Sequence, residues 1–142
     1  MIINREYYGS AKARYGLQAT YDLALNQGSR LRQIREVAED QAIPQQFLEQ
    51  VLVQLKRARL VKSYRGSHGG YALARDATKI TVLDVLTCLE GPIEIGAVNY
   101  KDEILANLLE SCKKQIRDSL KLSLADLIWR KHQATMKITY EI

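Results

Sequence analysis

Two consecutive stretches decide the fold of this chain, PQQFLEQVLVQLKR at residues 44–57 and LVKSYRGSHGGYALAR at residues 60–75. In the first, apolar residues recur at positions 47, 48, 51, 52 and 55, the spacing of one stripe along a helix. In the second, two strand-like runs flank a loop with three glycines, which predicts a β-hairpin. Glycine lets a backbone approach another surface closely, so we expect the tip of this hairpin to be slim.

The polar face of the predicted helix carries groups that can contact bases in a DNA major groove. An amide both donates and accepts hydrogen bonds, as the N6/N7 edge of adenine requires, and Glu49 can accept from cytosine N4 or orient a neighbour. The helix opens at Pro44, whose fixed φ suits the first helical position. The candidate base-reading residues are Gln45, Gln46, Glu49 and Gln50. An amphipathic helix whose glutamine-rich face is exposed to solvent and binds no DNA explains the same pattern.

Basic and small residues make the hairpin a candidate wing that contacts DNA. Arg65 lies at its tip, where it can reach a minor groove or a phosphate. Gly66 and Ser67 keep the tip narrow and expose backbone N–H donors. Arg57 and Lys62 flank the hairpin as charges that add affinity without sequence preference.

Two helices are expected before this unit. The first covers residues 7–26, with Ser10 as its N-cap and Gly28 just past its end. The second lies within residues 29–41 and is joined to the third by a few residues, which predicts a helix-turn-helix. Near the start of the first helix, Lys12, Arg14 and Tyr15 either contact a phosphate strand or form an exposed turn without a partner.

The net charge of +5 is concentrated in the first part of the chain. Residues 1–80 hold 13 Lys and Arg against 7 Asp and Glu, whereas residues 81–142 hold 8 against 9. A localised cationic surface attracts polyanions and is typical of binding to a phosphate backbone, although a solvated basic surface gives the same count.

Composition predicts a folded cytosolic protein that is not an enzyme. The chain is 46% hydrophobic and 26% charged, as in globular domains. No apolar run approaches the roughly 20 residues that cross a bilayer, and the start lacks a signal-peptide core. No Ser/His/Asp or Cys/His set, metal-ligand spacing or phosphate-cradling loop that leads into a helix can be assembled.

Several motifs occur along the chain in one order, namely RYGL at residues 14–17, FLEQVL at 47–52, RGSHGGYALAR at 65–75, LEGP at 89–92 and SLADL at 123–127. Together they resemble the Rrf2 family of bacterial winged helix-turn-helix transcription regulators. The resemblance implies a mainly α fold with a small β-hairpin wing and a long dimerisation helix. It also implies a homodimer that binds a dyad-symmetric operator in double-stranded DNA and regulates transcription, and we expect this regulator to be a repressor.

The residues after the hairpin agree with a dimeric protein. A helix over residues 81–89 is opened by a Thr-x-x-Asp box and ended by Gly91 and Pro92. Residues 101–122 then form a long helix whose apolar stripe is too long for so small a domain to cover, so we expect a partner helix on it. The candidate interface residues are Ile104, Leu105, Leu108, Leu109, Cys112, Ile116 and Leu120.

A second cap box, formed by Ser123 and Asp126, starts a last helix that is expected to run through Trp129. Residues 138–142 could form a strand or a loose tail. We therefore divide the chain into a winged helix-turn-helix DNA-binding domain at residues 1–80 and connector and dimerisation helices at residues 81–142.

The sensing chemistry is where the sequence departs from the resemblance. Family members that bind an iron–sulfur cluster carry three closely spaced cysteines after the Glu-Gly-Pro element, because thiolates are the preferred ligands of such iron. Here residues 93–100 contain none, so no metal ligand can be assigned. The two cysteines, Cys88 and Cys112, lie 24 positions apart and form neither a zinc spacing nor a disulfide framework.

Three interpretations of Cys88 and Cys112 stay open. In the first, both are small apolar residues of a core or interface. In the second, they form a redox pair, or a cluster site completed by non-cysteine ligands, with the two cysteines coming from opposite subunits. In the third, they have no sensing role, and a protein or small-molecule effector controls the regulator. A winged helix that binds only proteins is the rival to DNA binding, and it predicts little dependence of DNA affinity on salt.

Overall fold

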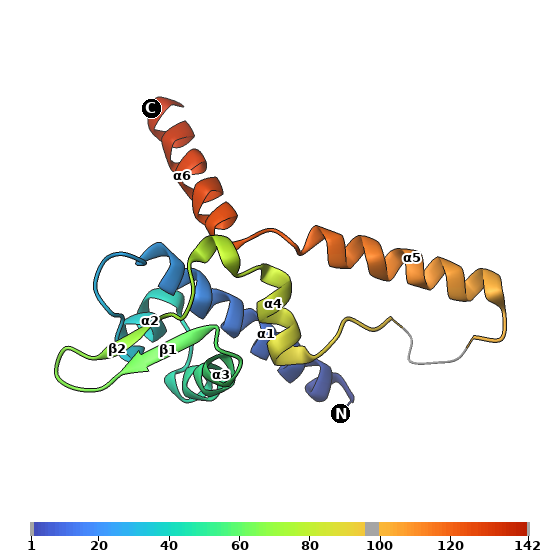
Figure 1. The fold of residues 1–142 in the computed structure, drawn as a ribbon, viewed down its shortest axis with the longest axis horizontal. Helices are drawn as coiled ribbons and strands as arrows, with labels where there is room; N and C mark the ends of the chain where they lie inside the picture. Colours follow the sequence, from blue (N-terminus) through green and yellow to red (C-terminus); the bar gives the residue numbers. More distant parts are fainter. Residues whose placement is uncertain (1, 96–99, 142) are drawn as a thin grey trace.

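The computed structural model describes residues 2–95 and 100–141, with side chains described over residues 11–95 and 100–140. Helices α1 to α4 and a two-stranded hairpin form one body, from which α5 and α6 project in different directions (Figure 1). The elements are α1 (Ile2–Leu25), α2 (Ile34–Gln41), α3 (Gln45–Arg57), β1 (Val61–Tyr64), β2 (Gly70–Leu73), the 3-10 turn η1 (Ala77–Lys79), α4 (Val82–Glu90), α5 (Glu103–Ser119) and α6 (Leu124–Glu141). The predicted fold class, mainly α with a hairpin wing, is confirmed.

The core forms where α3 packs against α1 and α4. Leu48, Val51, Leu52 and Leu55 of α3 are buried, as the apolar spacing predicts. Burying one such side chain stabilises the fold by about 1.5–3 kcal/mol. Phe47, the fifth member of the predicted stripe, is instead 41% exposed, because it lies at the edge of the stripe.

A short turn at residues 42–44 joins α2 to α3 and completes the helix-turn-helix. Ala42 takes a left-handed conformation with φ 53°, and Ile43 donates its N–H to the carbonyl of Ala38 at 2.9 Å. Ile43 is buried, so this turn is fixed to the core. Pro44 occupies the N-cap position rather than the first helical position, so α3 begins one residue later than predicted. The Pro44 carbonyl accepts from Leu48 N–H at 3.1 Å.

The wing is an antiparallel hairpin held against the helix-turn-helix by one further residue. Val61 pairs with Leu73 and Tyr64 with Gly70. On the other edge of β2, Tyr71 exchanges two backbone hydrogen bonds with Arg32, at 3.0 and 2.7 Å. The segment that leads into α2 therefore acts as a third, single-residue strand.

The cap boxes predicted for the C-terminal half are present. Thr81 Oγ1 accepts from Asp84 N–H at 3.0 Å, and Ser123 Oγ accepts from Asp126 N–H at the same distance. Leu124 is fully buried in the core that α1, α3 and α4 share, so the start of α6 is anchored there.

Two helix ends differ from expectation. The structure places Ser10 inside α1 rather than at its N-cap, because the helix begins at Ile2. The last helix runs to Glu141, so the strand or loose tail expected at the end is wrong for residues 138–141. The β-branched residues near the end weaken a helix, but no proline or glycine stops it.

Candidate nucleic-acid interface

The outer face of α3 presents the four predicted base-reading residues to solvent. Gln45, Gln46, Glu49 and Gln50 are all exposed, while the opposite face of the helix is sealed in the core. Within residues 11–95 and 100–140, no hydrogen bond or ion pair uses any of these four side chains. Their donors and acceptors are therefore free for a ligand.

The wing tip has the slim form that its glycines predict. Arg65, Gly66 and Ser67 are exposed, and Gly66 has a φ of 107°, which favours glycine. A Cβ on Gly69 would lie 2.2 Å from the carbonyl oxygen of Tyr64, so only glycine fits this turn. Lys62, whose Nζ lies 5.5 Å from the ring centroid of Tyr64, is exposed on β1.

Two of the three residues of α1 that were predicted to contact DNA, Arg14 and Tyr15, lie beside the start of α3. The Tyr15 and Phe47 ring centroids are 6.2 Å apart, and the Arg14 guanidinium lies 5.2 Å from the Tyr15 centroid. Arg14 is exposed beside this pair, which places a cation next to the first turn of α3. Lys12 is half-buried and lies near Cys88, while Arg57 is exposed at the far end of α3.

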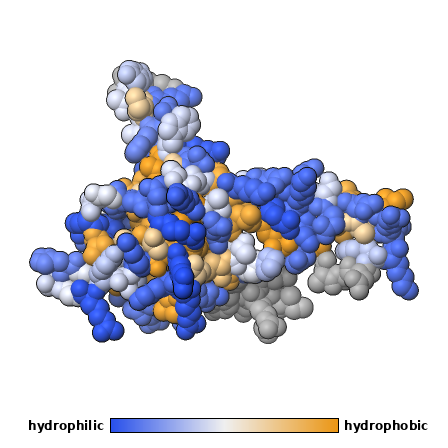
Figure 2. Space-filling view, viewed as in Figure 1, coloured by the Kyte–Doolittle hydropathy of each residue, from blue (hydrophilic) through white to orange (hydrophobic). Residues whose placement is uncertain are grey.

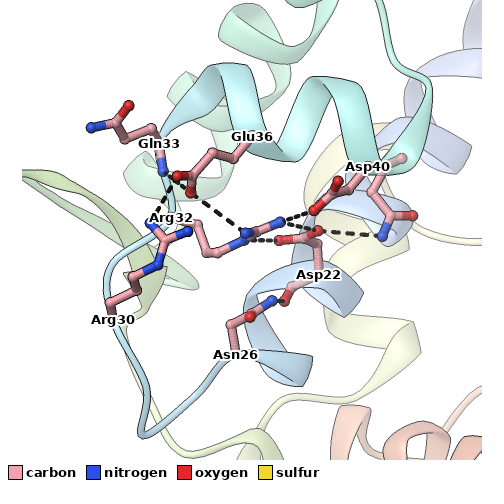
Figure 3. Close-up of polar contacts among 8 residues, drawn as sticks. Asp22, Asn26, Arg30, Arg32, Gln33, Glu36 and Asp40 are labelled. Atoms are coloured by element: carbon pink, nitrogen blue, oxygen red, sulfur yellow. Dashed lines mark hydrogen bonds and ion pairs between the residues drawn. The ribbon is translucent and has the colours of Figure 1, made fainter.

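Sequence reasoning missed Arg32, which positions the helix-turn-helix and the wing (Figure 3). Its guanidinium donates to both carboxylate oxygens of Asp22 on α1, at 2.9 and 3.2 Å, and also to Asp40 on α2. Arg32 is only 8% exposed, and Asp22 is buried with it. The hydrogen bonds that Arg32 donates to Asp22 raise the pKa of Arg32 above its ordinary value; burial opposes this shift and Asp40 supports it.

Arg32 connects three elements at one residue. Its side chain ties α1 to α2, and its backbone holds β2 through Tyr71. Gly70 makes the close approach feasible, because a Cβ there would lie 2.7 Å from the Arg32 carbonyl oxygen. The only sequence signal was the i,i+4 pair with Glu36, which gives no hint of a buried partner ten residues earlier.

Six of the seven predicted dimer-interface residues lie on α5, which the body of the protein does not bury, and Leu120 caps the C-terminal end of this helix. No residue of α5 is buried, and Ile104 and Leu108 are 79% and 56% exposed. Leu105 and Ile116 are exposed as well, whereas Leu109, Cys112 and Leu120 are half-buried. Figure 2 shows hydrophobic surface along this projecting helix.

In the described part of the chain, no helix is both long and apolar enough to cross a membrane.

The two cysteines do not fit the three-thiolate site of an iron–sulfur regulator. Burial raises the pKa of the Cys88 thiol, a shift that the nearby Lys12 opposes, and the Cys88 Sγ contacts the Gln54 carbonyl oxygen at 3.5 Å. Among the residues described, no group of three His, Cys, Asp or Glu could hold a metal ion. Residues 96–99 of the predicted sensing loop lie outside the described residues, but their sequence supplies no cysteine.

Helix-turn-helix, wing and projecting helix together define a winged-helix transcription regulator. The family model named Rrf2 and described as an iron-dependent transcriptional regulator matches residues 9–130. The chain therefore belongs to the Rrf2 family, as its motifs predicted.

Relatives of known name agree with this family. The chain is similar to CymR of Bacillus subtilis, with 39% identity over 84 residues, which are 59% of this chain and 61% of CymR. It is similar to IscR of Cereibacter sphaeroides, with 45% identity over 83 residues, 57% of this chain and 54% of IscR. These matches thus span only a half to two thirds of either relative.

The similarity in structure extends further along the chain. The solved structure of CymR from B. subtilis, titled the global cysteine regulator, superposes with a TM-score of 0.78 at 32% identity and covers 84% of this chain and 94% of that one. Fold and relatives are those of transcription regulators rather than enzymes.

Proposed function

We propose that this protein binds a dyad-symmetric operator in double-stranded DNA as a homodimer and represses transcription. The observation that carries the proposal is the exposed face of α3, whose glutamines and glutamate have no partner in the described residues although Leu48, Val51, Leu52 and Leu55 on the opposite face are buried. A major groove about 12 Å wide admits such a helix. The family membership supports the same function.

Each part of the interface has a separate role in this proposal. Gln45, Gln46, Glu49 and Gln50 read base edges, and Arg65 enters the adjacent minor groove. Phosphate contacts fall to cations and donors around them, which set the register of the protein on the duplex without reading sequence. These contacts come from Lys12, Arg14, Tyr15, Arg57, Lys62, Gly66 and Ser67.

The uncovered apolar stripe of α5 supports the proposed homodimer. A second copy would cover Ile104, Leu105 and Leu108, and we assign dimerisation to residues 81–142 and DNA contact to residues 1–80. Two symmetric recognition helices would then lie about 34 Å apart, one turn of duplex.

We further propose that the signal reaches this regulator without a cysteine-ligated cluster, through a protein or small-molecule effector. A thiol with a raised pKa, such as that of Cys88, is mostly protonated at neutral pH. It is therefore poorly suited to redox chemistry or to binding cluster iron, both of which use the thiolate. Anaerobically purified protein should show no charge-transfer absorbance in the visible range. Visible bands that disappear on changing Cys88 and Cys112 to Ser would contradict this view.

Fragments of genomic DNA selected with the purified protein would supply the operator, and fluorescence anisotropy would measure affinity for it. Gln46→Ala should weaken discrimination at one base by about 1–3 kcal/mol, while Gln133→Ala, an exposed glutamine on α6, should change nothing. Arg65→Ala should weaken binding, and Lys79→Ala on η1 serves as its control.

A weak salt dependence of affinity would instead favour the protein-binding winged helix, because several phosphate contacts give a steep slope. The proposed interface would be wrong if Gln46→Ala and Arg65→Ala both bound operator as the wild type does.

A further inference from the structure

A hollow of about 690 Å³ lies at the base of the wing, between the C-terminal end of α3 and strand β1. Four of its eight lining residues are cations, Lys56, Arg59, Lys62 and Arg75, and none is acidic. Alanines and Val61 line much of the remainder. A concave surface with one sign of charge over an apolar floor raises the local concentration of anions.

Nothing in the described part of the protein neutralises these cations. No ion pair there involves any of the four, and Lys56 Nζ donates instead to the neutral Ser63 Oγ at 2.6 Å. The acidic residue next in sequence, Asp76, accepts from Thr78 N–H and Thr78 Oγ1 at 2.9 and 2.6 Å. The hollow thus keeps its positive charge available to a ligand.

Arg59 occupies a backbone position that glycine would fill more easily. Its φ of 60° lies in the left-handed region, at the turn where α3 ends and β1 begins. A left-handed residue just past a helix end is usually glycine, since a side chain there adds strain. An arginine that holds this strained position is a reason to look for a function in its side chain.

The hollow lies where a DNA strand would pass. Lys56 follows Gln45 by eleven residues and Glu49 by seven, about three and two helical turns, so all three lie on one side of α3. The major and minor grooves of a duplex are separated by one sugar–phosphate strand. If α3 enters the major groove and the wing tip enters the adjacent minor groove, that strand crosses between α3 and β1.

We propose that this hollow binds phosphate groups of the DNA strand that separates the two grooves, with Arg59 and Arg75 as ligands that the function above does not include. The inference rests on the proposed DNA binding by α3 and the wing. Because phosphate contacts carry no sequence information, the hollow contributes equally to operator and to unrelated DNA.

The test uses the full chain and a fluorescein-labelled duplex of arbitrary sequence, with affinity measured over a range of salt. Arg59→Gly removes the cation and relieves the left-handed strain, so its melting temperature should equal or exceed that of the wild type. Its DNA affinity should nevertheless fall, and the slope of log K against log salt should decrease by about one for each phosphate that the variant no longer binds. Arg75→Gln should act likewise, and Lys114→Gln on α5 should change neither quantity.

Three outcomes would overturn the proposal for the hollow, and they differ in what they mean for the proposed function. If Arg59→Gly and Arg75→Gln keep the wild-type slope while Arg65→Ala weakens binding, the hollow has no role and the proposed function stands. If wild-type protein binds no DNA, both proposals fail. The hollow binds a free anion instead of DNA if two results occur together. Inorganic phosphate at constant ionic strength stabilises the wild type but not Arg59→Gly, and the two proteins show the same dependence of DNA affinity on salt.

Discussion

At the scale of single residues, Arg32 is the buried charge that connects the elements of the proposed interface. An ion pair removed from water loses hydration that its mutual attraction only partly replaces, so such a pair is weak evidence for stability. The Arg32 guanidinium nevertheless determines which surfaces of α1 and α2 meet, because Asp22 and Asp40 lie on different helices. We infer that its contribution is to orientation more than to net stability.

The pair can be tested with a double-mutant cycle. Arg32→Met leaves the Asp22 carboxylate buried without a cationic partner and should lower the free energy of unfolding by about 3–5 kcal/mol. Arg32→Met combined with Asp22→Leu should recover most of this loss, because neither charge then remains buried. Urea unfolding followed by circular dichroism measures both values. Equal losses in the single and double variants would show that packing, not charge, is responsible.

Sequence reasoning succeeded at residues whose environment depends on their own helix. The exposure of Gln45, Gln46, Glu49 and Gln50 follows from the 3.6-residue period alone, once the buried stripe is located. It failed for Arg32, since burial there depends on tertiary contact with Asp22 across the α1–α2 connection. The contacts of the four α3 side chains with DNA remain predictions.

At the scale of elements, the caps of α4 and α6 were predictable because each is a local pattern of four residues. Thr81→Ala removes the oxygen that accepts from Asp84 N–H and should lower the free energy of unfolding by about 1 kcal/mol. Thr87→Ala, an exposed position inside the same helix, should be neutral or slightly stabilising, since alanine favours helix interiors. Thermal and urea unfolding of both variants would compare them, and equal effects would exclude a capping role.

The cap of α6 also predicts a dependence of stability on pH. Hydrogen bonds from the Ser123 backbone and hydroxyl lower the pKa of Asp126 below its ordinary value. A carboxylate with a lowered pKa in the folded state stabilises the fold above its ordinary pKa, and this stabilisation is lost as pH falls through the folded value. Asp126→Asn should therefore show less loss of stability than the wild type on acidification, measured by urea unfolding from neutral to acidic pH. Parallel curves would mean that the hydrogen bonds do not favour the charged form.

The length of α6 could not be predicted from local propensity. Ile138 and Thr139 are β-branched and suggested a strand, but an uninterrupted helix already anchored at Leu124 propagates one hydrogen bond per residue. The end of α1 was predicted within one residue, because Gly28 follows it. Its start was predicted at residue 7, but the helix begins at Ile2, since no glycine or proline precedes residue 7 to stop it there.

At the scale of the whole molecule, α5 and α6 are attached to the winged helix through a fixed junction. Val82 N–H donates to the Leu122 carbonyl and Leu124 N–H to the Ile80 carbonyl, at 2.9 and 2.8 Å. The buried Leu124 adds an apolar anchor. A partner bound to α5 would therefore influence where α3 lies, and this link is how dimerisation could set the distance between two half-sites.

Leu108→Glu tests that link. Leu108 is 56% exposed, so the substitution should leave the fold of one subunit intact, yet it places a charge in the proposed interface and should shift the protein toward monomer. Asn107→Glu adds the same charge on another side of α5 and should leave the dimer unchanged. Sedimentation velocity would measure the oligomeric state of both variants.

DNA binding should follow the oligomeric state. Leu108→Glu should lose affinity for an operator with two half-sites but keep that of the wild-type subunit for a single half-site. Insertion of about half a duplex turn between the half-sites should weaken the wild-type dimer similarly, because it rotates one site to the opposite side of the helix. A Leu108→Glu protein that remained dimeric, or a dimer indifferent to the insertion, would show that α5 does not determine how the recognition helices are spaced.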